Sequence, residues 1–463
     1  MSAAGLPRRL SDIEASFAYT HALMRGTSQV TTLLSLRGDL PAGALERAVS
    51  RWVRDVPVLR LRIEERRDGL WFREEPNLQP AQLGYGLLGP SHTPDDVFRQ
   101  ELNDILPTGG PLWRLRAVSE PSSGATEGQG APGRTHLYFT RNHAISDGHS
   151  TGALLRALLD QLDGPAPRTP AGALAHPRPY EDVRRVPPNA DGLDYRAPGA
   201  ATGSPVPEEI RPLPALPFAS VAPWAERTAD FVPLALCPEQ SAALKSWCRA
   251  HEVTVNQFLG AAFARAYAEV AGRPEVRLLT AVSLRGRYPG PAALPDVGCF
   301  INVVGVPVAL DTNGPATAAR RYGAALRDAD ARWRPPRRDH SAIRRAVEVA
   351  AAGTDAPGVC ITNVGVVDPA LGTHAARVTE FRTVVNRTGA NYGLVLHVAT
   401  FAGSVSLSVA YGVPATDPVV ASAVATALYE RVLRPTAEDP SPFPAPVRAA
   451  RESARRTRAA AAG

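Results

Sequence analysis

The chain has 463 residues, of which 44% are hydrophobic and 21% charged, and its formal net charge is +6 at pH 7. This length favours two domains over one, and the balanced composition argues against disorder along the whole chain. No apolar run is long enough for a transmembrane span, and the N-terminus lacks the apolar core of a secretory signal, so we expect a cytoplasmic protein without a membrane span.

Nearly all of the basic residues are arginine, since Lys245 is the single lysine. No Lys/Arg run is interleaved with aromatic residues, so the sequence does not indicate nucleic-acid binding. The mildly basic balance favours an acidic partner, such as a carrier protein or a phosphate-bearing cofactor. The four cysteines show no C-x-x-C spacing, so we expect reduced thiols and no metal site.

The N-terminal part mixes helix and strand patterns. Apolar residues at helical spacing after Pro41 predict an amphipathic helix within 40–59. A Gly/Ser/Pro-rich loop is expected at 119–134, and a second amphipathic helix follows at 150–164. Alternating side chains predict strands at 59–65, 69–75, 111–118 and 134–144.

Prolines cluster between residues 165 and 217, where they forbid regular helix and discourage central strand. We therefore expect an N-terminal lobe over 1–164, an extended crossover linker over 165–218 and a C-terminal lobe over 219–463. The last residues of that lobe are expected to form an arginine-rich, frayed tail.

The C-terminal part also contains both kinds of element. Thr254 and Gln257 have the spacing of a capping box and open a helix. A second helix is predicted near 316–333. Strands are predicted at 276–284, 299–310 and 358–367, with a hairpin over 394–411. The expected fold class is therefore α/β (α+β), in two lobes of similar size.

The segment RNHAISDGHS at 141–150 lies where a strand gives way to a loop and then to a helix. Strand alternation places His143 on one face and Asn142 on the other. Gly148 allows a backbone conformation that a β-carbon would hinder, and free amides at the helix start are placed to stabilise an oxyanion. A second interpretation, a packed histidine and a helix-capping Asp147, stays open on these residues alone.

The wider sequence resembles the condensation-domain superfamily of acyltransferases, whose signature is H-H-x-x-x-D-G. The segments GGPLWRLRAV, VTVNQFLGAAFARA, AVSLRGR and VGCFINVVGVPV resemble that family in order and spacing, over nearly the whole chain. TNVGVVD is similar to a segment of free-standing alcohol acyltransferases. In style the chain is closest to polyketide-associated or alcohol O-acyltransferases.

The resemblance implies two chloramphenicol-acetyltransferase-like lobes in a V shape with a central tunnel. His143 matches the catalytic histidine, which would take the proton of the acceptor, and a pKa near the unperturbed 6.5 suits such a base. Asp147 matches the family aspartate, which pairs with an arginine to hold the loop in shape. Arg285 is the first candidate for that arginine and Arg287 the second.

Other positions are less decisive. Asn142 replaces the first histidine of the signature, and we expect it to form hydrogen bonds with the neighbouring backbone. His149, Asn302 and Asn363 are possible substrate-binding residues, although a solvated His149 and asparagines that satisfy the backbone are alternatives. His397 is expected to be a packed core histidine.

We therefore expect an O-acyltransferase that moves an acyl group from a carrier-protein or coenzyme A thioester to the alcohol of a natural-product-type small molecule, with no bound cofactor. An amide-forming condensation enzyme is one alternative. A non-catalytic lobe pair that recruits partners is another, which the intact His143, Asp147 and Gly148 oppose and Asn142 slightly favours. The sequence contains no P-loop, so it does not indicate an NTPase.

Overall fold

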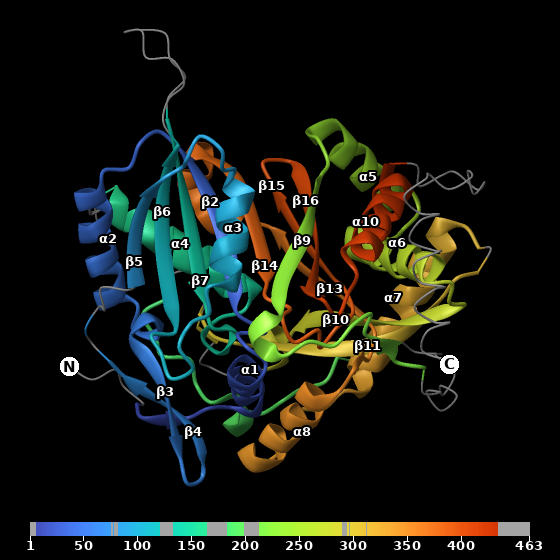
Figure 1. The fold of residues 1–463 in the computed structure, drawn as a ribbon, viewed down its shortest axis with the longest axis horizontal. Coiled ribbons are helices and arrows are strands. Elements are labelled where there is room, and N and C mark those ends of the chain that lie inside the picture. Colours follow the sequence, from blue (N-terminus) through green and yellow to red (C-terminus); the bar gives the residue numbers. More distant parts are fainter. Residues whose placement is uncertain are drawn as a thin grey trace, which may run out of the picture.

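The computed structural model describes residues 6–75, 77, 82–120, 133–163, 183–198, 213–288, 294–295, 297–311 and 313–433. Two sheets form its frame, one of five strands and one of six, and helices pack against both (Figure 1). The expected α/β fold in two lobes is confirmed. In the described part of the chain, no helix is long and apolar enough to cross a membrane.

The five-stranded sheet is covered on both faces. Trp52 of α2 (Ala42–Asp55) contacts Trp113 and Phe139 edge to face on the side where α4 (Gly148–Leu162) also packs. The other face packs against α3 (Pro94–Asn103). The strands in spatial order are β14 (Val378–Val385), β2 (Val30–Arg37), β7 (Arg134–Arg141), β6 (Trp113–Glu120) and β5 (Leu83–Leu87).

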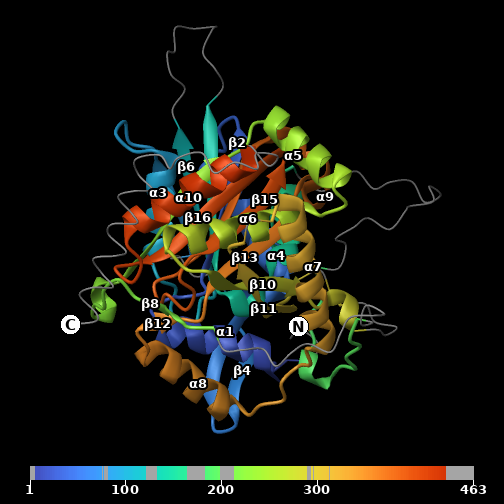
Figure 2. The same cartoon turned by 90° about the vertical axis from the view of Figure 1, so that its right-hand side faces the viewer.

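The six-stranded sheet is covered by α5 (Pro238–Ala250), α6 (Val255–Val270), α7 (Pro315–Arg332) and α10 (Pro418–Leu433), which share one apolar core with its strands (Figure 2). The predicted capping box at the start of α6 is confirmed, because Gln257 N donates to Thr254 Oγ1 at 3.1 Å and Thr254 N donates to Gln257 Oε1 at 2.8 Å. The strands in spatial order are β11 (Ile301–Ala309), β10 (Glu275–Ser283), β13 (Val359–Val366), β15 (Val395–Phe401), β16 (Ser404–Val413) and β9 (Thr228–Ala235).

One strand of the C-terminal part lies in the N-terminal sheet. After β13 the chain passes through α9 (Asp368–Leu371) and a 3-10 turn into β14, which pairs antiparallel with β2. The orange β14 therefore lies beside the blue β2 in Figure 1, at the edge of the five-stranded sheet, and β15 then returns to the six-stranded sheet. The predicted C-terminal lobe, 219–463, therefore contributes one strand to the N-terminal sheet, because β14 pairs with the free edge of β2 although the two strands are far apart in the chain.

The predicted linker and tail are described only in part. Residues 183–198 and 213–218 contain a short 3-10 turn and β8 (Leu216–Pro217), which pairs with β12 (Asp355–Ala356). The rest of the predicted linker lies outside the described residues, as does the arginine-rich tail. The loop expected at 119–134 joins β6 to β7, although its residues 121–132 are also outside the described part.

A small base lies beneath the two sheets. The hairpin of β3 (Leu61–Arg66) and β4 (Gly69–Glu74) pairs with the short β1 (Arg8–Arg9). Two helices pack together beside it, α1 (Asp12–Leu23) and α8 (His340–Ala352) (Figure 1). Ser11 and Glu14 form a capping box that begins α1.

Candidate active site

His143 lies where β7 ends and the chain turns towards α4. The strand stops at Arg141, and His143 begins a 3-10 turn, so the strand alternation expected up to residue 143 does not reach it. The imidazole stacks on the ring of Phe17 in α1, with 4.2 Å between the centroids and 7° between the planes. His143 is only 9% exposed, and this stacking fixes the plane of its ring.

Burial makes His143 a weaker base than a free histidine. Its pKa is lowered to about 4, chiefly because burial penalises the charged ring, and the charges of Arg141 and Arg387 lower it further. The carboxylate of Asp147 acts in the opposite direction. The expectation of a pKa near 6.5 is therefore wrong, since the sequence did not reveal that the ring is buried. At neutral pH the imidazole is uncharged and free to accept a proton.

Asp147 holds the start of α4 and is 2% exposed. As the N-cap it accepts hydrogen bonds from Ser150 N at 2.9 Å and from Ser150 Oγ at 2.7 Å. Phe300 N, from the C-terminal lobe, donates to its other oxygen at 3.1 Å. Burial alone would raise the pKa of Asp147, but Arg285 and Ser150 outweigh burial and lower it. Asp147 is therefore ionised and fully hydrogen-bonded.

Arg285 is the arginine that pairs with Asp147. Its Nη2 lies 3.1 Å from both carboxylate oxygens, and its Nη1 donates to Pro295 O at 2.6 Å. The second candidate, Arg287, instead donates to Asp330 at 2.5 Å. The ion pair of Asp147 and Arg285 joins the motif loop to the C-terminal lobe, as the resemblance implied.

Asn142 is 1% exposed and acts on its own loop. Its Oδ1 accepts a hydrogen bond from Ala144 N at 2.9 Å, which caps the 3-10 turn that His143 begins. Its backbone N donates to Leu112 O at 2.8 Å. The side-chain Nδ2 is buried and has no hydrogen-bond partner among the described residues. Asn142 thus shapes the turn through its acceptor atom.

Gly148 is needed for a reason other than the one expected. It begins α4 and is not among the described residues with positive φ, so no special backbone conformation requires glycine there. A β-carbon at Gly148 would instead lie 2.8 Å from Val364 Cγ1, and one at Gly152 would lie 2.4 Å from the β-carbon of Ala370. The two glycines let α4 approach β13 and α9 closely, along the seam between the lobes.

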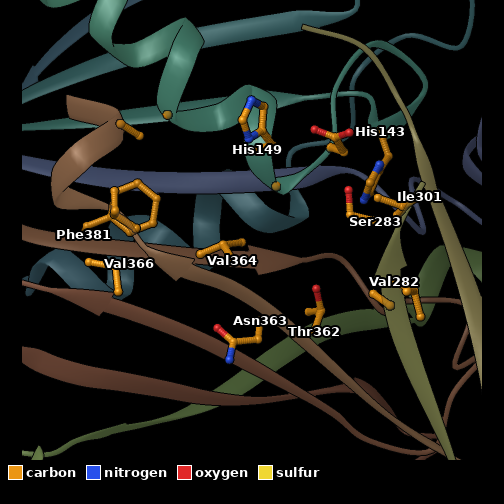
Figure 3. Close-up of a pocket in the computed structure, with 16 residues that line it drawn as sticks. His143, His149, Val282, Ser283, Ile301, Thr362, Asn363, Val364, Val366 and Phe381 are labelled. Carbon is orange, nitrogen blue, oxygen red and sulfur yellow. The ribbon is translucent and has the colours of Figure 1, made fainter. Parts of the chain in front are cut away.

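A pocket of about 230 Å³ opens beside His143, between α4 and the end of β10 (Figure 3). Residues of both sheets line it, so the site needs both lobes. Its polar side chains are His143, Asp147, His149, Ser283, Thr362 and Asn363. Its apolar lining includes Ala281, Val282, Ile301, Val364, Val366, Val367, Ala370 and Phe381.

The predicted substrate-binding residues divide at this pocket. His149 is exposed and lines it, and Asn363 lines it while its Oδ1 accepts a hydrogen bond from Gly365 N at 2.8 Å. Asn302 is not among the lining residues, because its neighbour Ile301 takes the inward position on β11. The Nδ2 of Asn302 is buried, and no described residue forms a hydrogen bond with it.

Sequence reasoning missed three residues around His143. Ser283 ends β10, and its side chain points towards His143 in Figure 3. Thr362 lines the same pocket, and Phe17 provides the stacking partner. Ser283 lies in the segment that carries Arg285, so strand alternation offered a signal for it. Phe17 had none, because only the folded chain brings α1 to the motif.

A second, smaller cavity of about 30 Å³ touches His143 between β2, β14 and β15. His397 lines it, so this histidine is buried as expected but lies next to the site and not in a remote core. Its Nε2 accepts a hydrogen bond from Val385 N at 3.4 Å. The remaining polar lining residues are Arg141, Asp147, Thr151, Thr362 and Thr383.

Arg141 is the largest charged side chain in that lining and is 1% exposed. Its guanidinium donates to Ser146 Oγ at 2.6 Å, to Thr32 Oγ1 at 3.0 Å and to Thr151 Oγ1. Burial lowers the pKa of Arg141 to about 9, so the group remains charged at neutral pH.

Residues 225–413 match the family described as the C-terminus of phthiocerol/phthiodiolone dimycocerosyl transferase. No curated protein matches the chain. The chain is similar in structure to trichothecene 15-O-acetyltransferase from Fusarium sporotrichioides, with 12% identity, a TM-score of 0.65, and 92% of this chain and 95% of that chain covered.

Two further solved structures share the fold. Polyketide synthase associated protein 5 from Mycobacterium tuberculosis is 18% identical with a TM-score of 0.56, and 93% of this chain and 98% of that chain are covered. The first condensation domain of the CDA synthetase is 16% identical with a TM-score of 0.59, and 93% and 95% are covered. At these identities the likeness establishes a common fold.

Proposed function

We propose that this chain is an O-acyltransferase. The proposal starts from its condensation-domain-like fold and from the match of residues 225–413 to the C-terminus of a dimycocerosyl transferase family. The enzyme moves an acyl group from a carrier-protein or coenzyme A thioester to the alcohol of a small natural-product-type acceptor. The observation that carries the proposal is an uncharged His143 at the pocket where both lobes meet.

The reaction requires one base that later acts as an acid. Nδ1 of His143 lies 3.8 Å from Cys299 Sγ, which leaves Nε2 for the substrate. Nε2 takes the proton of the acceptor hydroxyl while its oxygen bonds to the thioester carbonyl carbon. The tetrahedral intermediate then collapses, the carbon–sulfur bond breaks, and the imidazolium returns the proton to the leaving sulfur. The products are an ester and a free thiol.

The surroundings of the imidazole suit this sequence. Burial raises the pKa of Cys299 well above its usual value, so its thiol stays neutral beside Nδ1. The low pKa of His143 keeps the ring unprotonated before the reaction. The same low pKa makes the transient imidazolium a strong acid towards the leaving thiolate. The ring is thus a modest base and an effective proton donor.

The two structural groups of the motif have a different task. Asp147 and Arg285 are joined to each other and to Ser150, so neither is free to exchange a proton with substrate. Their contacts hold the N-terminus of α4 against the C-terminal lobe and thereby position the turn that carries His143. We assign Asp147 and Arg285 as positioning residues, and Gly148 as the close contact that lets the lobes meet.

The lining of the pocket favours an apolar acyl or acceptor group beside the reacting atoms. Val282, Ile301, Val364 and Phe381 are among its apolar lining residues. His149, Ser283 and Asn363 are the polar side chains available to orient a substrate. An amine acceptor would use the same base, so the amide-forming alternative is tested by the same assay.

The test is a matrix of acyl-coenzyme A and acyl-carrier-protein donors against alcohol and amine acceptors, with products identified by mass spectrometry. We expect ester products and about a 10²–10⁴-fold loss of turnover in His143→Ala. His136→Ala is the matched control, because His136 is a buried histidine of β7, the strand that leads to the turn of His143, and does not line the pocket. Amide products alone would favour the condensation alternative. Turnover in His143→Ala within a few-fold of the parent would refute the assignment of the base.

A further inference from the structure

The loop between β14 and β15 contains polar side chains that the protein leaves unsatisfied. Arg387 Nε, Thr388 Oγ1 and Asn391 Oδ1 are buried atoms that find no hydrogen-bond partner in the part of the chain that the structure describes. Thr388 is 1% exposed and Arg387 is 7% exposed. Buried polar groups in folded proteins are nearly always hydrogen-bonded, so three unsatisfied atoms within one short loop need an explanation.

Arg387 is the most costly of the three, because it carries a charge. Among the described residues its guanidinium forms neither a hydrogen bond nor an ion pair. It does lie over the ring of Tyr392 in a cation–π contact, with 5.2 Å between the guanidinium carbon and the ring centroid. Arg285 has the carboxylate of Asp147, and Arg141 has three hydroxyl partners. A buried charge without a partner is strongly unfavourable unless something else supplies the opposite charge.

The loop adjoins the reacting histidine. Val385, two residues before Arg387, lines the smaller cavity together with His143 and donates its backbone hydrogen bond to His397. The charge of Arg387 lowers the pKa of both His143 and His397, which places the guanidinium within electrostatic range of both rings. That cavity, of about 30 Å³, has room for a group the size of about two water molecules. Its lining ends at Val385 on this side, and Arg387 itself is not among the lining residues.

We propose that Arg387 binds a carboxylate carried by one of the two substrates and so selects acidic substrates for this site. The inference rests on the proposed acyl transfer for its consequence, but not for the binding itself. A planar guanidinium matches a carboxylate through two parallel hydrogen bonds, and the neighbouring Thr388 hydroxyl adds a third donor. Bound negative charge would also offset the effect of Arg387 on His143, so the correct substrate would strengthen the base that acts on it.

The carboxylate can come from either side of the reaction. It belongs to the acceptor if the acceptor is a hydroxy acid, and to the acyl group if that group is the half-thioester of a dicarboxylic acid. Both sources present the same chemistry to Arg387, so the activity arms of the experiment must separate them.

Binding is measured first, on the full chain, as the shift in melting temperature with lactate against the uncharged lactamide at equal ionic strength. We expect lactate to stabilise the parent more than lactamide does, and Arg387→Met to abolish the difference. Because Arg387→Met removes an unpaired buried charge, its melting temperature without ligand should not fall below that of the parent. Arg345→Met is the control, since it removes the same charge from an exposed position on α8.

Activity is measured second, in two arms. One arm compares lactate with a neutral alcohol as acceptor, using a neutral acyl thioester. The other compares a succinyl with a butyryl thioester, using a neutral acceptor. A hydrogen-bonded charge pair predicts about a tenfold to hundredfold preference for the acid in one arm, lost in Arg387→Met and partly kept in Arg387→Lys.

Each outcome decides something. Equal effects of lactate and lactamide on the parent would overturn the proposal, as would a lactate effect that survives in Arg387→Met. A large fall in the melting temperature of Arg387→Met would show that the guanidinium is structural and would also overturn it. A parent that binds lactate through Arg387 but transfers no acyl group would leave this site standing and refute the proposed function.

Discussion

The two sides of His143 are built on opposite principles. On the motif side, the carboxylate of Asp147 accepts from Ser150, Phe300 and Arg285, and no acceptor of that carboxylate is left idle. On the other side, the loop between β14 and β15 leaves Arg387 and Thr388 with buried atoms that no described residue satisfies. A network in which every polar group has a hydrogen-bond partner makes the local structure rigid. A group without a partner can still form a hydrogen bond with a ligand. From this difference we infer that the Asp147 side positions the histidine and that the Arg387 side is the one available to a ligand.

The largest expected effect breaks the motif side. Asp147→Ala leaves the partly buried Arg285 without its carboxylate, and breaking such a pair commonly costs about 3–5 kcal/mol of the free energy of unfolding. Urea denaturation should show this loss, and turnover should fall with it. The contrast with Arg387→Met, which we expect to be neutral for stability, is the sharpest form of the comparison. Wild-type stability in Asp147→Ala, with activity lost, would mean that Asp147 takes part directly in the chemistry.

The next effect concerns the histidine between the two sides. The pKa of His143 falls from 6.5 to about 4 on folding, so below pH 6.5 the unfolded chain binds the extra proton. Stability contributed by neutral His143 is therefore complete above pH 6.5 and is lost as the pH falls towards 4, by about 3 kcal/mol over that window.

His143→Gln should remove this part of the pH dependence, which denaturation of parent and variant at several pH values would detect. His397 remains in both proteins, but His143 helps to lower the pKa of His397, so the difference between the two curves includes this coupling. Parallel stability curves for the two proteins would contradict the buried, low-pKa state of His143.

A smaller effect tests the seam on which the comparison depends. Gly148→Ala places a β-carbon 2.8 Å from Val364 Cγ1, and such overpacking typically costs about 1–3 kcal/mol. Turnover should fall as well, because the shift displaces α4 beside the pocket. The double variant Gly148→Ala, Val364→Ala restores space and should recover most of both losses. Failure of the second substitution to rescue the first would place the need for glycine elsewhere.

The smallest effect probes the turn itself. Asn142→His restores the residue that the related signature carries, and we expect turnover within about tenfold of the parent, or about 1.4 kcal/mol in barrier. The acceptor that caps the turn is lost, but the position does not line the pocket. If the parent shows no turnover and Asn142→His does, the parent has lost catalytic activity through its motif and the chain is a non-catalytic scaffold.

The sequence predicted the local parts of this structure well. The helix predicted at 150–164, which the structure has at Gly148–Leu162, and the capping box at Thr254 depend on neighbours within a few residues. α1 was missed because its buried residues include Asp12, Glu14 and His21, so it shows no apolar stripe. β14 could not be assigned to the N-terminal sheet, since its pairing partner β2 lies at the other end of the chain.

The residues of the site also fall into those that the sequence predicted and those that it did not. His143, Asp147 and Arg285 were found because the motif and the arginine segment resemble a known pattern, and the ion pair followed from it. Phe17 and Arg387 gave no such signal, because neither lies in a recognisable motif. Their importance depends on burial, which a linear pattern of single residues does not reveal. The lowered pKa of His143 was missed for the same reason.

The placement of β14 also affects how the chain folds during its synthesis. A chain made from its N-terminus exposes the edge of β2 until residues 378–385 have been synthesised, since only β14 covers that edge. An uncovered strand edge invites pairing with other chains, so nascent or truncated forms should be prone to aggregate. Expression of the first lobe by itself is therefore a poor route to a smaller enzyme. A split protein should be cut within the proline-rich crossover and both pieces produced together.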